Sequence, residues 1–231
     1  MVNIGGGAYY RKHWKVLDYQ SFHYRIPSYY IDYNFDLASN NPLPFKTNSV
    51  NFFYSSHTLE HIPQEFCQNI FNEFYRCLKK GGAVRLALPD FDKIFEAYRN
   101  NEKTIFNSVF FKNKQEENYR KFLDFFATYM KNKVSKNEFD ENFRSMKKEE
   151  FADYYTFKIP RNNQKIHGGF HINWWNFEKA EKMLKRAGFK EKYRSSSQKS
   201  CFLEMRCKKN GKIFGFDDTY PEISFFIEAL K

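Results

Sequence analysis

The chain has 231 residues, a formal net charge of +11 and aromatic side chains at 20% of its positions. This length suffices for one α/β domain with a sizeable core and is short for two. The lysines are spread along the chain among Glu and Asp, which favours a solvated basic surface over a nucleic-acid footprint. No apolar run reaches membrane-spanning length and no signal-peptide pattern opens the chain, so we expect a cytoplasmic protein with reduced cysteines.

The first two predicted strands both end at a candidate ligand-binding feature. Val2–Ile4 leads into Gly5, Gly6 and Gly7, and a glycine cluster after a strand lets a ligand approach the backbone closely. Trp14–Asp18 ends in a carboxylate that is positioned to accept hydrogen bonds from a ribose diol. These features together indicate a nucleoside-binding pocket.

The spacing between the two features excludes a dinucleotide site. A dinucleotide fingerprint needs G-x-G-x-x-G, a helix, and an acid about 20 residues further on. Here Tyr10 stands at the position of the last glycine, and only residues 8–13 separate Gly7 from Trp14, which is under two helical turns. The sequence therefore predicts a ligand that has a nucleoside and no phosphates.

The next elements predict a parallel sheet. Tyr30–Phe35 is expected to be a third strand, followed by a loop. Ser49–Ser56 and Ala83–Leu88 are typical of buried strands, and Gln64–Leu78 between them has the apolar spacing of an amphipathic helix that Gly81-Gly82 would stop. Two parallel strands joined by a helix form a right-handed crossover, and ligands bind beyond the carboxyl ends of such strands. The polar residues expected at this edge are His57, Glu60, His61 and Asp90.

The middle of the chain differs in composition from both ends. Residues 91–165 are rich in Lys, Glu, Asn and Phe and contain no glycine. Within a single domain of residues 1–231, we expect this segment to be a mostly helical insertion that covers the edge of the sheet and contacts the substrate. A helical addition used only for packing or for oligomer contact is the alternative.

The last part of the chain predicts a helix and two strands. Asn176 caps a helix over Phe177–Ala187, and Gly188 stops it. Phe189–Arg194 and Ile223–Leu230 are expected to be strands that pair antiparallel, with Asp217-Asp218 in a turn between them.

Two histidine patterns raise the question of a metal. His57-Thr-Leu-Glu-His61 matches the H-x-x-E-H pattern of zinc proteases, but a helix that presents both histidines would have to begin too early for Pro63. His167 and His171 stand four residues apart, yet the two glycines between them favour a loop and contact with an acceptor. No third ligand is evident, so the sequence predicts no metal.

These segments in order resemble the class I S-adenosylmethionine-dependent methyltransferases, and most of all a short bacterial group similar to the methyltransferase type 11 family. The resemblance rests on IGGG, WKVLD, NSVNFFYSSHTLEHIP, RCLKKGG, RLALPDF and HINWWNFEKAEKMLKRAGF. It covers residues 2–94 and 167–230. It implies a Rossmann-like, seven-stranded sheet that is mostly parallel with the last strand antiparallel, helices on both faces, and S-adenosyl-L-methionine as the cofactor.

The resemblance also assigns roles to residues at the strand ends. The glycine loop would face the amino-acid end of the cofactor, the acid after the second strand would hold the ribose, the loop after the third would lie near the adenine, and the end of the fourth would meet the methyl-transfer site. The residues that match these positions are Gly5, Gly6, Gly7, Asp18, Asp36, Leu37, Ser56 and His57.

The resemblance implies methyl transfer to a small-molecule or glycan acceptor, and the related bacterial enzymes suggest surface-polysaccharide biosynthesis. A sugar hydroxyl needs a base as its proton leaves, and we predict His57 and His171 as the catalytic residues. Two alternatives stay open. An RNA methyltransferase is motivated by the positive charge, and a non-catalytic S-adenosylmethionine-binding protein by Asn3 and Tyr9, where the family usually has an acidic residue and a glycine.

Overall fold

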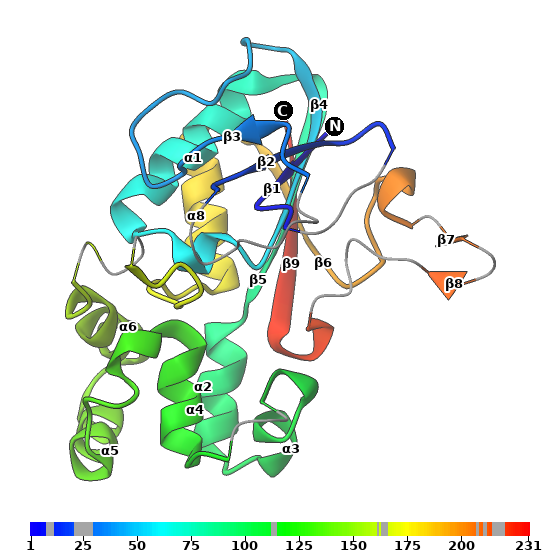
Figure 1. The fold of residues 1–231 in the computed structure, drawn as a ribbon. Coiled ribbons are helices and arrows are strands. Elements are labelled where there is room, and N and C mark those ends of the chain that lie inside the picture. Colours follow the sequence, from blue (N-terminus) through cyan, green and yellow to red (C-terminus); the bar gives the residue numbers. More distant parts are fainter. Residues whose placement is uncertain are drawn as a thin grey trace.

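A seven-stranded sheet with the order β3-β2-β1-β4-β5-β9-β6 organises the protein. The computed structural model describes residues 1–7, 12–20, 30–111, 115–160, 162, 166–206, 208–209, 212–213 and 220–231. The strands are β1 (Val2–Ile4), β2 (Lys15–Asp18), β3 (Tyr33–Asn34), β4 (Val50–Ser56), β5 (Leu78–Pro89), β6 (Glu191–Ser195) and β9 (Ser224–Leu230) (Figure 1).

The first five strands are parallel, as the sequence predicts. Val2–Ile4 pairs with Lys15–Leu17 on one side and with Phe53–Ser55 on the other. All of β1 is buried, which explains its uniformly apolar or amide composition. The carboxyl ends of β1, β2 and β4 therefore meet at one edge of the sheet.

The last strand is antiparallel, which confirms the predicted sheet. β9 lies between β5 and β6 and pairs antiparallel with both. Ile227 of β9 is opposite Leu86 of β5 on one side and Arg194 of β6 on the other. β6 thus runs in the direction of the parallel strands. The predicted turn at Asp217-Asp218 lies outside the described residues.

The junction between α1 and β5 differs from the prediction. α1 (Gln64–Cys77) ends one residue early, and Leu78 already has extended backbone as the first residue of β5. Gly81 and Gly82 therefore lie inside a strand and do not stop the helix. Gly81 has a φ of +77°, where a side chain is strained, so this glycine serves an irregular stretch of β5 in place of a helix cap.

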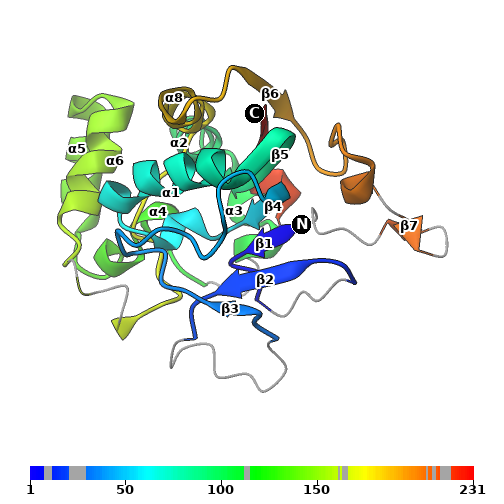
Figure 2. The same ribbon diagram turned by 90° about the horizontal axis from the view of Figure 1, so that it is seen from above.

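Helices α1 and α8 (Phe177–Ala187) cover one face of the sheet (Figures 1 and 2). They contact each other, and the Gln68 amide donates to the carbonyl of Met183 at 3.1 Å. Both bury their apolar faces in a core built on β1, β4, β5 and β9. On the opposite face, Trp14, Phe52 and Tyr54 pack with Met205 from the 3₁₀ turn Leu203–Arg206. A short hairpin, β7 (Lys208–Lys209) and β8 (Lys212–Ile213), follows that turn.

The middle segment is helical, as predicted, and lies where β5 leads into α2 (Figure 1). Its helices are α2 (Phe91–Arg99), α3 (Lys103–Phe106), α4 (Asn118–Phe126), α5 (Lys136–Ser145) and α6 (Lys148–Phe157), with 3₁₀ turns at Val109–Phe111 and Thr128–Met130. They enclose a second core that is dominated by Phe side chains.

Two adjacent tryptophans join the two cores. Trp175 is buried in the core of the sheet, whereas Trp174 is buried in the core of the insertion against Phe91. The carbonyl of Trp175 also accepts from the N–H of Phe91 at 2.9 Å. The loop before α8 thus fixes the insertion to the sheet. None of the described helices is both long and apolar enough to cross a membrane.

Candidate active site

The glycine loop after β1 turns sharply and reaches the end of β2. Gly5 has a φ of +65°, and its N–H donates to the carbonyl of Leu17 at 2.8 Å. A Cβ atom on Gly5 would lie 2.2 Å from Oγ1 of Thr58, so only glycine fits here. Gly7 has a φ of +51°, and its N–H donates to Oδ2 of Asp18 at 2.9 Å.

Two backbone N–H groups hold the Asp18 carboxylate in place, and its oxygens can each accept a further hydrogen bond from a ligand. Its Oδ2 accepts from Gly7, and its Oδ1 accepts from the N–H of Tyr19 at 2.7 Å. Burial raises the pKa of Asp18 above its ordinary value, against the lowering effect of these two donors. Each carboxylate oxygen has a second lone pair, so the group has the means to accept two ribose hydroxyls.

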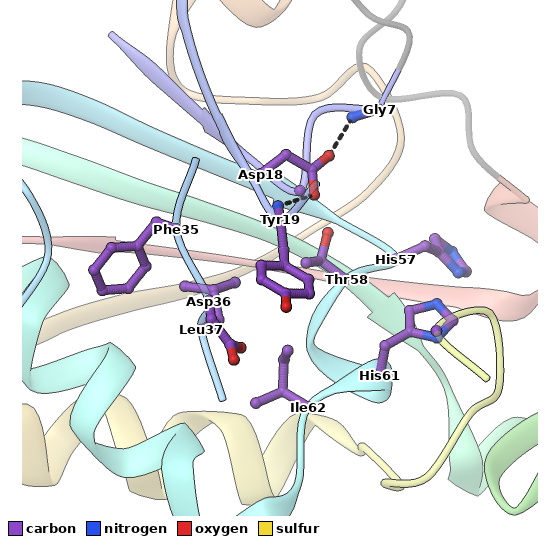
Figure 3. A pocket seen from close by; sticks show the side chains of 12 residues that line it. Gly7, Asp18, Tyr19, Phe35, Asp36, Leu37, His57, Thr58, His61 and Ile62 are labelled. Atoms are coloured by element: carbon purple, nitrogen blue, oxygen red, sulfur yellow. Dashed lines mark hydrogen bonds between the residues drawn. The ribbon is translucent and has the colours of Figure 1, made fainter. Parts of the chain in front are cut away.

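One pocket brings most of the predicted cofactor residues together (Figure 3). The residues that line it are Gly5, Gly7, Asp18, Tyr19, Phe35, Asp36, Leu37, His57, Thr58, His61, Ile62 and Gly168. Gly6 and Ser56 are not among them. A Cβ on Gly6 would meet Val16 and Asn3, so this glycine packs against the sheet.

Several lining residues were not predicted from the sequence. Tyr19 directly follows Asp18, Phe35 directly precedes Asp36, and Thr58 directly follows His57. Their position next to a predicted residue at a strand end was the available signal. Tyr19 and Phe35 add aromatic surface, and Thr58 bonds back to the carbonyls of Ile4 and Ser56 at 3.3 and 3.1 Å.

His57 lies at the end of β4 in a constrained backbone conformation. Its φ is +48°, and its N–H donates to the carbonyl of Ala87 in β5 at 3.0 Å. The Ser224 hydroxyl donates to the Tyr220 carbonyl at 2.8 Å, so its oxygen is available to accept from Nε2 of His57, 2.7 Å away. Nδ1 of the same ring lies 3.2 Å from Oε1 of Glu60, so both ring nitrogens have a polar neighbour.

The carboxylate of Glu60 lies at the centre of three histidines. Glu60 belongs to the 3₁₀ turn Leu59–His61 and is fully buried. Its Oε1 is 3.2 Å from Nδ1 of His57, 3.9 Å from Nε2 of His171 and 4.0 Å from Nε2 of His61. Burial alone would raise the pKa of the Glu60 carboxyl, but the contact with His57 and the other histidines hold that pKa at about 2.

His61 and His171, which are far apart in the sequence, both lie near this carboxylate. Nδ1 of His61 is 3.0 Å from the Phe170 carbonyl, and Nδ1 of His171 is 2.7 Å from the Phe125 carbonyl. Burial and the neighbouring His61 lower the pKa of His171 to about 4, so it is neutral at pH 7. Neither His171 nor Glu60 is among the described residues that line the pocket.

The structure gives the other polar candidates different positions. The Asp90 carboxylate caps α2 by accepting from the N–H of Lys93 at 3.2 Å. His167 lies in a loop, as the glycines predict, and its ring stacks on Phe170. Neither residue lines the pocket.

The residues of the pocket fit a nucleoside ligand with an amino-acid tail. Gly5 and Gly7 line the pocket without side chains, the Asp18 carboxylate matches a diol, and Leu37 and Ile62 supply apolar walls. No Lys or Arg is among the described lining residues, as suits a ligand without phosphates. Residues 19–86 match the model of a family described as a methyltransferase domain.

The matched segment and the seven-stranded, mostly parallel sheet agree with the fold that the sequence resemblance implies, that of the class I S-adenosylmethionine-dependent methyltransferases. The matched segment runs from the residue after Asp18 into β5 and includes His57, Glu60 and His61. The sequence matches no curated protein.

The solved structures that are similar to this one over the whole chain include methyltransferases. An S-adenosylmethionine-dependent methyltransferase from Mesorhizobium loti is 14% identical, with a TM-score of 0.48, and the match covers 100% of this chain and 89% of that one. A possible histamine N-methyltransferase from Thermotoga maritima is 13% identical, with a TM-score of 0.45 and coverage of 100% and 81%. Human N-acetylserotonin methyltransferase in complex with S-adenosylmethionine is 12% identical, with a TM-score of 0.43 and coverage of 100% and 46%.

Proposed function

We propose that this protein transfers a methyl group from S-adenosylmethionine to a hydroxyl of a small-molecule or glycan acceptor, as in the cytoplasmic synthesis of polysaccharide building blocks. The observation that supports the proposal is that one pocket is lined by Gly5, Gly7 and Asp18 together with His57. Gly5 and Gly7 would bind the amino-acid end of the cofactor and Asp18 its ribose, with Asp36 and Leu37 beside the adenine.

The histidine end of the pocket suits an acceptor that must lose a proton. When bound, S-adenosylmethionine supplies a methyl group on a positively charged sulfur. The acceptor oxygen would take the methyl group, the electron pair of the carbon–sulfur bond would stay on sulfur, and the imidazole of His57 would accept the hydroxyl proton. His171 would assist from its place beside Glu60, with its Nε2 3.9 Å from Oε1 of that residue.

The insertion is the proposed acceptor side of the site. Phe110 lies 6.1 Å from the ring of His171 and 5.1 Å from the ring of Tyr220, and Tyr220 in turn lies 5.6 Å from the ring of His57. Aromatic side chains offer flat apolar surface to a sugar or an aromatic ring. These contacts favour the insertion as a substrate-binding segment over a purely structural addition.

Calorimetry with S-adenosylmethionine and S-adenosylhomocysteine, followed by transfer of a labelled methyl group to panels of sugars, sugar nucleotides, phenols and RNA, tests the proposal. We expect cofactor binding and labelling of a hydroxyl compound. Labelling of RNA alone, with binding that falls steeply as salt rises, would replace the proposal with an RNA methyltransferase. No heat at millimolar cofactor would reject any cofactor-dependent function.

A further inference from the structure

The Glu60 carboxylate is buried and only partly compensated. Glu60 is fully buried, Nδ1 of His57 lies 3.2 Å from its Oε1, and its Oε2 makes no hydrogen bond with any described residue. Burying a carboxylate without compensation is costly, so such a group is paired, hydrogen-bonded or bound to a metal. The groups nearest to Oε1 are the ring nitrogens of His57, His61 and His171.

The backbone contacts of His61 and His171 determine which nitrogen of each ring has a lone pair directed at the Glu60 carboxylate. Nδ1 of His61 contacts the Phe170 carbonyl and Nδ1 of His171 contacts the Phe125 carbonyl. A carbonyl only accepts, so each Nδ1 carries the proton and, in the neutral ring, each Nε2 carries a lone pair. Both Nε2 atoms face Oε1 of Glu60, at 4.0 and 3.9 Å.

Three lone-pair atoms that face one another repel unless a cation lies between them. The separations of 3.9 and 4.0 Å are too long for direct hydrogen bonds. One donor atom from each of Glu60, His61 and His171 lies within 4.8 Å of the other two. Around a tetrahedral zinc ion, with bonds of about 2.0–2.2 Å, neighbouring donors are about 3.3 Å apart, so small side-chain movements would close the site.

We infer that Glu60, His61 and His171 bind a divalent first-row transition-metal ion at the acceptor end of the pocket. Two imidazoles and one carboxylate suit Zn²⁺ and its neighbours, whereas Mg²⁺ and Ca²⁺ prefer oxygen ligands. The bonds from both Nδ1 atoms to backbone carbonyls are the outer-shell contacts that fix a metal-binding histidine in the right tautomer and orientation. His57 stays outside the ligand set as the proton acceptor.

The chain places this site where it would act on the acceptor. His57 and His61 both line the pocket, and Figure 3 shows their rings at the same end of it. A metal with three protein ligands keeps a coordination position for a further oxygen. This inference deepens the proposed function and rests on it for the role of the metal: an acceptor hydroxyl bound there becomes more acidic and yields its proton to His57.

The ligand set also explains why sequence reasoning predicts no metal. H-x-x-E-H supplies two neighbouring ligands, Glu60 and His61, and the third is 110 positions away from His61. The N–H groups of Ile172 and Asn173 donate to the Glu60 carbonyl at 2.9 and 3.1 Å, which holds His171 against the turn. Only this tertiary contact completes the set.

The experiment titrates the chelator-treated protein with Zn²⁺ by calorimetry and with Co²⁺ by visible absorption, using Mg²⁺ as the comparison ion. We expect one Zn²⁺ per chain and Co²⁺ ligand-field bands, with no comparable heat from Mg²⁺. Glu60→Gln and His61→Ala should each weaken Zn²⁺ binding at least about 100-fold, since loss of an outer-shell partner alone costs 10–100-fold. His167→Ala, from the same HGGFH loop as His171 but outside the cluster, should bind Zn²⁺ like the wild type.

Circular dichroism of each variant checks its fold. His61 is less buried than Glu60, so His61→Ala still tests the inference if Glu60→Gln unfolds. No Zn²⁺ binding by the wild type, or equal binding by His61→Ala, would overturn the inference. Cofactor heat without Zn²⁺ binding would reject the metal site and leave the proposed function standing. Zn²⁺ binding without cofactor heat would support the metal site and reject the proposed function.

Discussion

The N–H of Gly7 donates to Oδ2 of Asp18 at 2.9 Å, so the loop after β1 and the carboxylate that ends β2 form one unit. The two residues are 11 positions apart in the sequence, which is too short a separation for the helix and spacing that a dinucleotide site requires. The glycine loop orients the acid directly. Cofactor affinity should therefore depend on both residues.

Replacing Asp18 tests the ribose contact. Asp18→Ala should weaken binding of S-adenosylhomocysteine by about 1–3 kcal/mol, the cost of losing hydrogen bonds to a charged group. Calorimetry measures the change. Asp32→Ala is the matched control, because Asp32 bonds Lys15 and the N–H of Val16 and does not line the pocket. Equal affinities in Asp18→Ala and the wild type would mean that the ribose is held elsewhere.

Replacing Gly5 tests the tight turn of the glycine loop. Gly5→Ala combines a φ of +65° with a Cβ 2.2 Å from Thr58, whereas Gly81→Ala has a φ of +77° and nothing within 4 Å of its Cβ. Gly81→Ala should cost roughly 1–2 kcal/mol of unfolding free energy through its backbone alone. Gly5→Ala should cost clearly more, measured by urea unfolding.

The double variant Gly5→Ala/Thr58→Ala provides the check. Removing Oγ1 and Cγ2 of Thr58 deletes the two closest clashing atoms and should recover part of the lost stability. If Gly5→Ala and Gly81→Ala lose the same free energy, the approach of Thr58 contributes nothing and the loop is less constrained than the structure implies.

Local signals were sufficient to predict several elements. α8 begins and ends at the predicted residues because Asn176 accepts from the N–H of Lys179 at 2.8 Å and Gly188 has a φ of +112°. These caps are encoded within a few residues of the helix ends. The carboxyl ends of β1 and β2 could also be predicted from local sequence, because β1 leads directly into Gly5 and β2 ends at Asp18.

Non-local contacts could not be predicted from one sequence. The burial of Glu60 and its approach to His171 depend on a loop that is fixed by Trp174 and Trp175 in two different cores. The end of α1 was placed too late because Gly81-Gly82 is a common helix stop, whereas here the strand pairing with β4 begins already at Leu78. Tertiary pairing overrode the local signal.

Replacing the histidines tests the proposed chemistry. Once an acceptor is identified, His57→Ala should lower turnover by roughly 10²–10⁴-fold, the usual contribution of general-base catalysis, and leave cofactor affinity nearly unchanged. His171→Ala should also lower turnover more than cofactor affinity. Steady-state kinetics and calorimetry separate the two effects, with His167→Ala as the control. Full rates in both His57→Ala and His171→Ala would show that the proton leaves by another route.

A buried ion pair should make the stability of the sheet depend on pH. Oε1 of Glu228 in β9 lies 2.7 Å from Nη1 of Arg85 in β5, and both side chains are almost fully buried. Burial would raise the pKa of Glu228, but hydrogen bonds from Cys201 and Ser200 and the charge of Arg85 hold it below its ordinary value. A lowered carboxyl pKa adds stability above the unfolded-state pKa of about 4.3, and that stability is lost as pH falls through the folded-state pKa.

The variant Glu228→Gln should therefore remove part of the acid sensitivity. At pH 7 it should lose about 3–5 kcal/mol of unfolding free energy, because Arg85 is left buried without its anion. Between about pH 5 and pH 3, the free energy of the wild type should fall more steeply than that of the variant. Glu96→Gln, which breaks an exposed pair with Arg99, should cost at most about 1 kcal/mol. Parallel pH profiles for Glu228→Gln and the wild type would show that this pair contributes nothing to acid unfolding, since the proton uptake would then arise at other groups.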